Sequence, residues 1–234
     1  MNILVACEES QRVCKAFREK GHNAFSCDII PCSGGHPEWH IMGDVLPLLN
    51  GFSNFALENG AQSSIVGSWD MIIAFPPCTH LAVSGAAWFD KKRKDGRQKQ
   101  AIEFFMKFLQ ADCEKICIEN PVGIISGEYI PTHFPELTEK YSFPVKYTQT
   151  IQPYEFGDHA RKKTCLWLKG LPVLKPTKIV DPGYISEGGH SMGAASLYAR
   201  DENGKILRYN DPLTAKIRSK TFPGIAQAMA DQWG

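Results

Sequence analysis

Short apolar runs alternate with helical patterns along this chain. The apolar runs are too short for helices and indicate buried strands, at residues 2–7, 23–28, 71–75, 115–119 and 164–168. Between the first two, residues 10–20 place apolar side chains at helical spacing and stop at Gly21. A similar pattern covers residues 98–110, and an amphipathic helix is predicted to begin near Pro223. The alternation predicts an α/β fold with a mainly parallel sheet.

Polar stretches that carry proline and glycine separate these elements. We expect residues 51–69 to form a surface connection, residues 79–90 to form a loop, and residues 147–157 to form a strand that leaves the sheet. Residues 171–211 are rich in proline, glycine and polar side chains, with turn signals at 181–183, 187–189 and 203–204.

Reactive side chains follow two of the predicted strands at the point where each strand ends. Pro76 and Pro77 stop one strand because proline lacks a backbone N–H, and Cys78 comes next. Glu119 and Asn120 end the following strand and are expected at the same edge, where open α/β sheets bind ligands. A thiolate there can add to an electron-poor ring while a carboxyl group stabilises the adduct.

The first strand, helix and second strand form a β-α-β unit that ends in Asp28. In nucleotide-binding folds an acidic residue at this position accepts hydrogen bonds from ribose hydroxyls. The unit therefore predicts a nucleoside-containing ligand at the edge of the sheet.

Composition narrows the class of protein without selecting a partner. The chain has 234 residues and a formal net charge of +1, so a nucleic-acid partner has to be argued from local clusters. No apolar run reaches membrane-spanning length, and the first residues lack a signal-peptide pattern. Several of the eight cysteines lie in apolar strands, which indicates reduced thiols. We expect a cytoplasmic protein, in a bacterial or phage-infected cell, with no membrane partner.

One basic run follows the segment after Cys78, and its members are Lys91, Lys92, Arg93, Lys94, Arg97 and Lys99. Such a run is usually a solvated face. Its position beside a candidate nucleophile also makes it a candidate for contacts with a phosphate backbone.

A loop at residues 31–40 carries potential metal ligands. Cys27, Cys32, His36 and His40 are spaced loosely like a zinc site, but not like a common zinc finger. We therefore expect no metal here. The loop is expected to cover a pocket, with Trp39 as a packing or stacking group.

The motifs Pro76-Pro77-Cys78 and Glu119-Asn120-Pro121 together resemble those of the cytosine-5 DNA methyltransferase family, which carries a Pro-Cys and a Glu-Asn motif in this order. The resemblance implies a compact, phage-type member with a Rossmann-like methyltransferase sheet, S-adenosylmethionine as cofactor, and duplex or single-stranded DNA as partner. It further implies that Cys78 attacks cytosine, that Glu119 acts at nitrogen 3, and that Asn120 belongs to the catalytic group.

The resemblance also implies a set of cofactor contacts, at Cys7, Glu8, Ser10, Gln11, Asp28, Ile29, Asp44 and Pro76. In the family an aspartate corresponding to Asp44 lies near the adenine; it could also cap a helix at residues 45–49, and the two roles are compatible. Family members usually have a glycine-rich turn after the first strand. Residues 7–11 contain no glycine, so this turn is either an acidic cofactor contact or an ordinary strand-to-helix connection.

Expected contacts with the DNA substrate are Pro77, Ser84, Arg93, Arg161, Lys162 and Lys163. The family's Gln-x-Arg-x-Arg motif is poorly matched, since Ala160, Lys162 and Thr164 stand at those positions. Residues 84–89 are expected to be a mobile lid over the target base, or else a plain connection.

The chain is divided into a catalytic domain at 1–168, a reduced, loop-rich recognition region at 169–215, and a C-terminal helix at 216–234 that packs back on the catalytic domain. About forty residues are too few for an independent recognition domain. Two alternatives stay open: an enzyme acting on single-stranded nucleic acid or a free nucleotide, and a non-catalytic DNA-binding protein of this fold. We expect a monomer or a small homo-oligomer.

Overall fold

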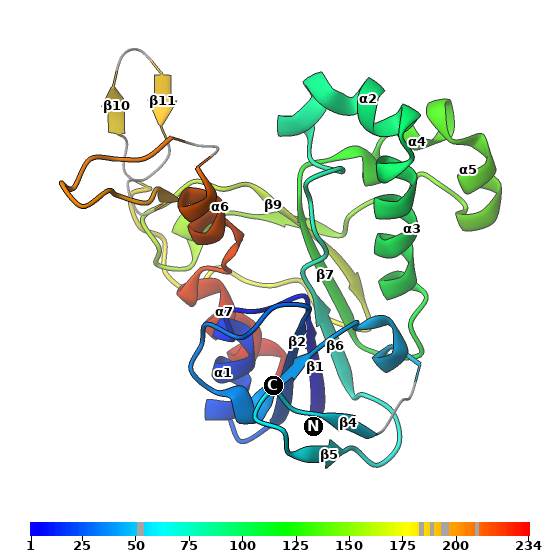
Figure 1. The fold of residues 1–234 in the computed structure, drawn as a ribbon, viewed down its shortest axis with the longest axis vertical. Coiled ribbons are helices and arrows are strands. Elements are labelled where there is room, and N and C mark those ends of the chain that lie inside the picture. The colour runs from blue at the N-terminus through cyan, green and yellow to red at the C-terminus, as the bar shows by residue number, and fades with distance from the viewer. Residues whose placement is uncertain (51–53, 183–184, 188–189, 193–196, 209–210) are drawn as a thin grey trace.

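A seven-stranded sheet of order β3-β2-β1-β6-β7-β9-β8 runs through the centre of the computed structural model (Figure 1). The structure describes residues 1–50, 54–182, 185–187, 190–192, 197–208 and 211–234. The strands of this sheet are β1 (Asn2–Ala6), β2 (Asn23–Asp28), β3 (His40–Met42), β6 (Met71–Ala74), β7 (Ile116–Pro121), β8 (Gln149–Ile151) and β9 (Thr164–Lys169). All pairings are parallel except those of β9, which runs antiparallel to both of its neighbours. The predicted α/β, Rossmann-like fold is confirmed.

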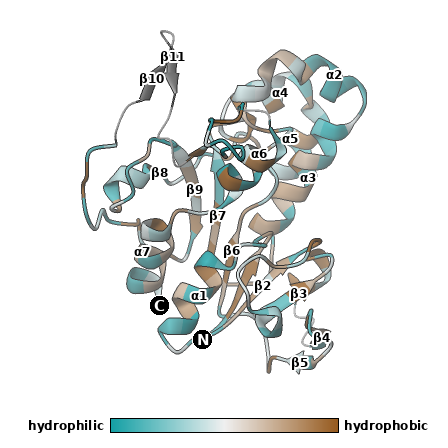
Figure 2. Cartoon of the chain, turned by 60° about the vertical axis from the view of Figure 1, so that its left-hand side comes forward, coloured by the Kyte–Doolittle hydropathy of each residue, from teal (hydrophilic) through white to brown (hydrophobic). Residues whose placement is uncertain are grey.

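Helices cover both faces of the sheet. One face packs against α1 (Arg12–Glu19) and α7 (Pro223–Trp233), and the other packs against α3 (Arg97–Leu109). Alternate residues of β1 divide between the two cores, with Ile3 and Val5 toward α1 and Leu4 and Ala6 toward α3. Figure 2 shows these strands as a hydrophobic layer between the helices.

The strand order places a ligand-binding edge between β1 and β6. If the seven strands of this sheet are numbered by their order along the chain, the sheet reads 3-2-1-4-5-7-6. The second and third strands therefore lie on one side of β1, and the later strands lie on the other side. Ala6 pairs with Ala74, and Ala74 pairs with Ile118, so β1, β6 and β7 end close together. Such a switch point is where open α/β sheets bind ligands.

Two expected connections are more ordered than predicted, and one expected strand is shorter. Residues 51–69 contain a hairpin of β4 (Asn54–Ala56) and β5 (Gln62–Ser64), and the Phe55 and Trp69 side chains are buried. The expected loop at 79–90 forms the 3-10 helix η3 (Val83–Trp88) and leads into α2 (Phe89–Lys94). The expected strand at 147–157 is only the short edge strand β8, followed by η5 (Pro153–Glu155). Buried apolar side chains hold the hairpin, and hydrogen bonds of Lys92 and Gln98 hold the helical segment after residue 82.

The remaining helices and hairpins surround the carboxyl edge of the sheet (Figure 1). On the α3 side lie α2, α4 (Tyr129–His133) and α5 (Pro135–Tyr141), and the other side carries α6 (Pro212–Ser219) and the β10 (Ile185–Glu187) and β11 (His190–Met192) hairpin. The remaining 3-10 helices are η1 (Pro37–Trp39), η2 (Leu46–Leu48) and η4 (Ile124–Ser126). The predicted domain boundary at 215–216 falls inside α6. Gly183, Gly188 and Gly189 of the turn signals lie outside the described residues.

All eight cysteines are free thiols. Within the described residues, no helix combines the length and the apolar character needed to cross a membrane.

Candidate active site

Cys78 lies four residues beyond the end of β6, in a turn that two prolines start. Its carbonyl oxygen accepts hydrogen bonds from the backbone N–H groups of Leu81 and Ala82, both at 2.9 Å. Pro76 is buried and Pro77 is exposed, so the turn is anchored on one side and open on the other. The Cys78 side chain is partly accessible at the carboxyl edge of the sheet.

Glu119, near the end of β7, lies close enough to Cys78 for their charges to interact. The pKa of the Cys78 thiol is raised by burial and by the negative charge of Glu119, while Lys162 and Arg218 oppose the rise. Burial also raises the pKa of Glu119, against the charge of Lys162 and a hydrogen bond from Thr164. Burial thus shifts both groups toward their protonated forms, and the negative charge on Glu119 adds to the shift of the thiol.

Asn120 joins the two motifs. Its side-chain amide donates a hydrogen bond of 2.7 Å to the carbonyl oxygen of Pro76, so β7 holds the turn that carries Cys78. The Asn120 carboxamide oxygen is buried and has no hydrogen-bond partner within the described residues. Asn120 thus fixes the position of the thiol relative to Glu119.

The turn after β1 adopts the shape of a glycine turn without containing glycine. Cys7 and Gln11 both have positive φ angles, 58° and 56°, a conformation that residues with a side chain rarely adopt. Gln11 is buried, and its carboxamide contacts Ser26 and both the N–H and the carbonyl of His36. Gln11 therefore holds the 31–40 loop against this turn, and Ser10 is buried beneath the same loop.

Gly34 makes this close packing possible. A Cβ atom at Gly34 would lie 2.4 Å from the Cβ of Gln11 and 2.7 Å from the carbonyl oxygen of Ser10. We expect Gly34→Ala to lower the free energy of unfolding by about 1–3 kcal/mol through overpacking. Gly43→Ala, where a Cβ meets nothing within 4 Å, should stay near the wild-type value. Urea titrations of both variants measure this difference, and equal stabilities would contradict the packing described.

Glu8 has a structural role that the sequence did not predict. Its carboxylate is buried and accepts hydrogen bonds from the backbone N–H groups of Val13 and Cys14, at 2.7 and 3.2 Å. These N–H groups belong to the first turn of α1, so Glu8 caps this helix. Its oxygens are already occupied by the fold.

Glu8 predicts a pH dependence of stability. Burial raises its pKa to about 7 from 4.5, so the folded protein binds a proton more tightly than the unfolded chain. This contribution is complete below pH 4.5 and is lost as the pH rises through about 7. Relative to Glu8→Gln, the wild type should gain roughly 2–3 kcal/mol between pH 8 and pH 5. Urea unfolding at the two pH values measures it, and a pH-independent difference would exclude this role of Glu8.

Acidic side chains gather on the other side of this turn. Asp28 ends β2 and Asp44 follows β3. Burial is the largest cause of the raised pKa of the Cys7 thiol, and the negative charges of Asp28 and Asp44 raise it further. Asp44 also accepts a hydrogen bond from the Leu46 N–H at 3.0 Å, at the start of η2. Next to Asp28, the Ile29 side chain is 78% exposed. The β1–β3 side of the edge thus offers carboxylates and an apolar surface.

Of the expected basic contacts, the structure places Lys162 close to both Cys78 and Glu119. Arg93 bonds with Tyr129 and Asp90, and the Arg161 guanidinium lies over the Tyr154 ring, 5.7 Å from its centre. Lys163 is exposed. Burial raises the pKa of the Cys165 thiol, and the positive charge of Lys163 opposes this rise. Ser84 is exposed in η3.

The helical segment after Cys78 is anchored to the fold by buried polar groups. The Lys92 amine donates a 2.6 Å hydrogen bond to the Thr79 carbonyl oxygen, and the Gln98 amide donates to the His80 carbonyl. Gln98 in turn accepts a hydrogen bond from Tyr129. Trp88, 62% exposed, is a large aromatic side chain that this segment presents to solvent.

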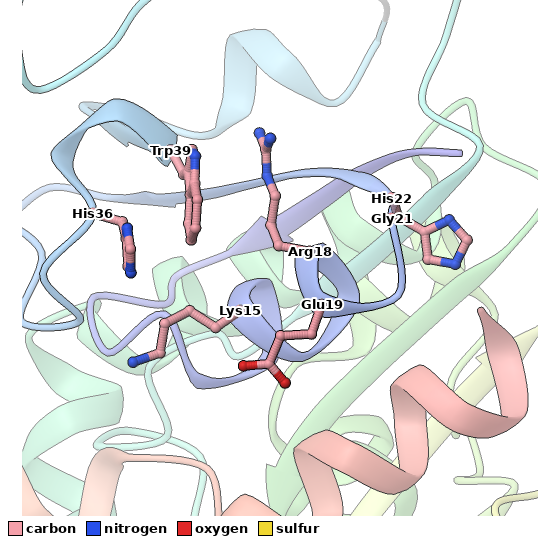
Figure 3. A pocket seen from close by; sticks show the side chains of 7 residues that line it. All are labelled: Lys15, Arg18, Glu19, Gly21, His22, His36 and Trp39. Atoms are coloured by element: carbon pink, nitrogen blue, oxygen red, sulfur yellow. The ribbon is translucent and has the colours of Figure 1, made fainter.

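The aromatic rings of the 31–40 loop pack beside α1. The His36 and Trp39 rings stack at 3.8 Å, and the Arg18 guanidinium lies over the Trp39 ring (Figure 3). These groups line a pocket of about 440 Å³ with Lys15 and Glu19, away from Cys78. His40 bonds with Ser26 and with the Ile30 carbonyl. Within the described residues, no group of three or more potential ligands could hold a metal ion.

The sequence did not predict the contribution of residues 218–221, at the end of α6 and directly after it. Arg218 lies near Cys78, and its carbonyl oxygen accepts a 2.8 Å hydrogen bond from the Lys162 amine. Lys220 lies 3.9 Å from the Glu9 carboxylate, and the Thr221 carbonyl accepts a bond from Arg12. The basic residues of this segment are visible in the sequence, but the groups that contact the segment lie between 56 and about 210 positions away along the chain.

Comparison with known proteins adds a likeness in fold. No protein-family model matches the sequence, and no curated protein matches it. A solved structure of a candidate DNA modification methyltransferase encoded within a prophage, from E. coli, matches with a TM-score of 0.46 and 16% identity, over 77% of this chain and 52% of that chain. This chain thus spans about half the length of that protein. At this identity and TM-score, the likeness concerns the path of the chain alone.

Proposed function

We propose that this protein transfers a methyl group from S-adenosylmethionine to carbon 5 of cytosine in DNA, through a covalent adduct with Cys78. The observation that carries the proposal is the meeting of Cys78 and Glu119 at the carboxyl edge of β6 and β7, with Asn120 fixing their relative position. A nucleophile and an acid on a rigid sheet edge suit an addition to the cytosine ring.

The charges around this pair suit the two proposed ligands. Lys162 and Arg218 lie on the side of Cys78 and favour an anionic nucleic acid. Carboxylates at the ends of β1, β2 and β3 favour a cationic cofactor, and the exposed Ile29 offers apolar surface to a purine ring. Asp28 would accept hydrogen bonds from the ribose hydroxyls.

The residues of this chain would act in a fixed order. Cys78 loses its thiol proton to solvent water and its sulfur bonds to carbon 6 of cytosine, while the Glu119 carboxyl group gives its proton to nitrogen 3. The electron pair displaced toward carbon 5 makes that atom nucleophilic. S-adenosylmethionine supplies an electrophilic methyl group from its sulfonium centre. After methyl transfer a base takes the carbon-5 proton, the bond from carbon 6 to Cys78 breaks, and nitrogen 3 returns its proton to Glu119.

On duplex DNA the target base must leave the helix to reach Cys78. Trp88, exposed on the anchored segment after the nucleophile, is a candidate to stack on a neighbouring base. In the described part of the recognition region at 169–215, the regular elements after β9 are the β10–β11 hairpin and the start of α6, which favours a short target.

The test is transfer of tritium from labelled S-adenosylmethionine to duplex DNA, single-stranded DNA and dCMP in parallel. We expect label at carbon 5 in a DNA substrate and none with Cys78→Ala. Label in dCMP alone would make the protein a nucleotide-modifying enzyme. Absence of label with all three, from folded protein, would overturn the proposal in favour of a binding protein.

A further inference from the structure

Glu9 carries a buried carboxylate in the turn between β1 and α1. Its side chain is 11% exposed, and neither carboxylate oxygen has a hydrogen-bond partner within the described part of the chain. Burying an ionised carboxylate without such partners is unfavourable, so proteins normally satisfy it. The neighbouring Glu8 differs because α1 already occupies its oxygens. The acceptor capacity of the Glu9 carboxylate is therefore not filled by the described residues.

Lys220 places a positive charge beside Glu9 without bonding to it. Its amine lies 3.9 Å from one Glu9 oxygen, beyond hydrogen-bond distance, and donates instead to the Ser33 hydroxyl at 2.9 Å. The Ser33 backbone N–H donates to the Glu9 carbonyl oxygen at 2.8 Å. Three distant segments thus meet here, and they leave an acceptor and a donor side by side.

A ligand that carries an ammonium and a carboxylate on one carbon atom would satisfy both charges. We propose that Glu9 and Lys220 bind the α-amino acid end of S-adenosylmethionine, with Glu9 accepting from the ammonium and Lys220 donating to the carboxylate. This assignment rests on the proposed function and deepens it. In this assignment the glycine-free turn after β1 contacts the cofactor through the Glu9 carboxylate.

Glu9 and Lys220 lie on the same side of the sheet edge as Asp28, which is proposed to bind the ribose of the cofactor. Burial raises the pKa of Asp28, and the charge of Glu9 adds to the effect, so the two carboxylates lie near each other. A ligand whose ribose bonds with Asp28 could reach Glu9 with its amino acid end. The Arg12 side chain bonds with the Thr221 carbonyl at 2.6 Å and thereby ties the Lys220 segment to α1.

The test is calorimetric binding of four ligands, which does not depend on turnover. S-adenosylmethionine and S-adenosylhomocysteine keep both charges of the amino acid end. Decarboxylated S-adenosylmethionine lacks the carboxylate, and methylthioadenosine lacks the whole amino acid end. We expect Glu9→Gln to weaken the first three about 10- to 100-fold and to leave methylthioadenosine unchanged. Lys220→Met should weaken only the two ligands that carry a carboxylate, by a similar factor.

Matched variants separate binding from folding. Glu38→Gln and Lys216→Met remove the same charges from exposed positions and should bind all ligands as the wild type does. This assignment would be overturned if Glu9→Gln and Lys220→Met weakened the binding of all four ligands equally, or weakened the binding of none. The proposed function would still stand in that case, provided that the wild type binds S-adenosylmethionine. An effect of Glu9→Gln that disappears with S-adenosylhomocysteine would move Glu9 to the sulfonium and also overturn it. A folded wild type that binds no ligand would instead reject the cofactor itself.

Discussion

Cys78→Ser is expected to reduce methyl transfer by roughly three orders of magnitude or more while the protein stays folded. A serine hydroxyl ionises far less readily than a thiol and cannot form the adduct at a useful rate. The side chain is partly accessible, so the free energy of unfolding should change by less than about 1 kcal/mol. Tritium transfer to DNA and urea unfolding measure the two effects.

Cys113→Ser provides the matched control for this substitution. Cys113 is buried just before β7, at the opposite edge of the sheet, and its thiol contacts the backbone carbonyls of Trp69 and Lys115. A serine there keeps a hydrogen-bond donor and should leave activity near that of the wild type. Full activity in Cys78→Ser would refute a covalent mechanism at this residue.

Glu119→Gln is expected to change two properties in opposite directions. Methyl transfer should fall by about 10²- to 10⁴-fold because the amide cannot protonate the cytosine ring. The Cys78 thiol should become more reactive, since the charge of Glu119 raises its pKa and the substitution removes that charge. Alkylation of Cys78 at pH 8, followed by mass spectrometry of its peptide, should be several-fold faster.

The exposed Glu128 supplies the control, because Glu128→Gln removes a carboxylate that lies outside the site. It should leave both readouts unchanged. If Glu119→Gln lowered activity and thiol reactivity together, the two side chains would not interact as the structure places them.

The sequence was sufficient to predict the five longer strands of the sheet and the common edge at which Cys78 and Glu119 lie. Buried parallel strands read as short apolar runs, and their carboxyl ends share one edge, so residues that follow two such strands come together. Proline at 76 and 77 fixed the end of β6 without any tertiary information.

The sequence could not separate the roles of Glu8 and Glu9. Which of two adjacent glutamates caps α1 depends on the positive φ angles of Cys7 and Gln11, which a glycine-free turn does not indicate. The fold alone brings Lys220 to this turn, from more than 200 positions away. The helical state of residues 83–94 depends likewise on tertiary bonds of Lys92 and Gln98.

A covalent complex with DNA that contains 5-fluorocytosine tests the central claim most directly. Fluorine at carbon 5 cannot leave as a proton, so the bond between Cys78 and carbon 6 should persist after methyl transfer. With S-adenosylmethionine present, we predict an intact-protein mass increased by the oligonucleotide and one methyl group, with the adduct on the Cys78 peptide and absent from Cys78→Ser. Methylation of ordinary DNA without any such adduct, or an adduct on another cysteine, would contradict this account.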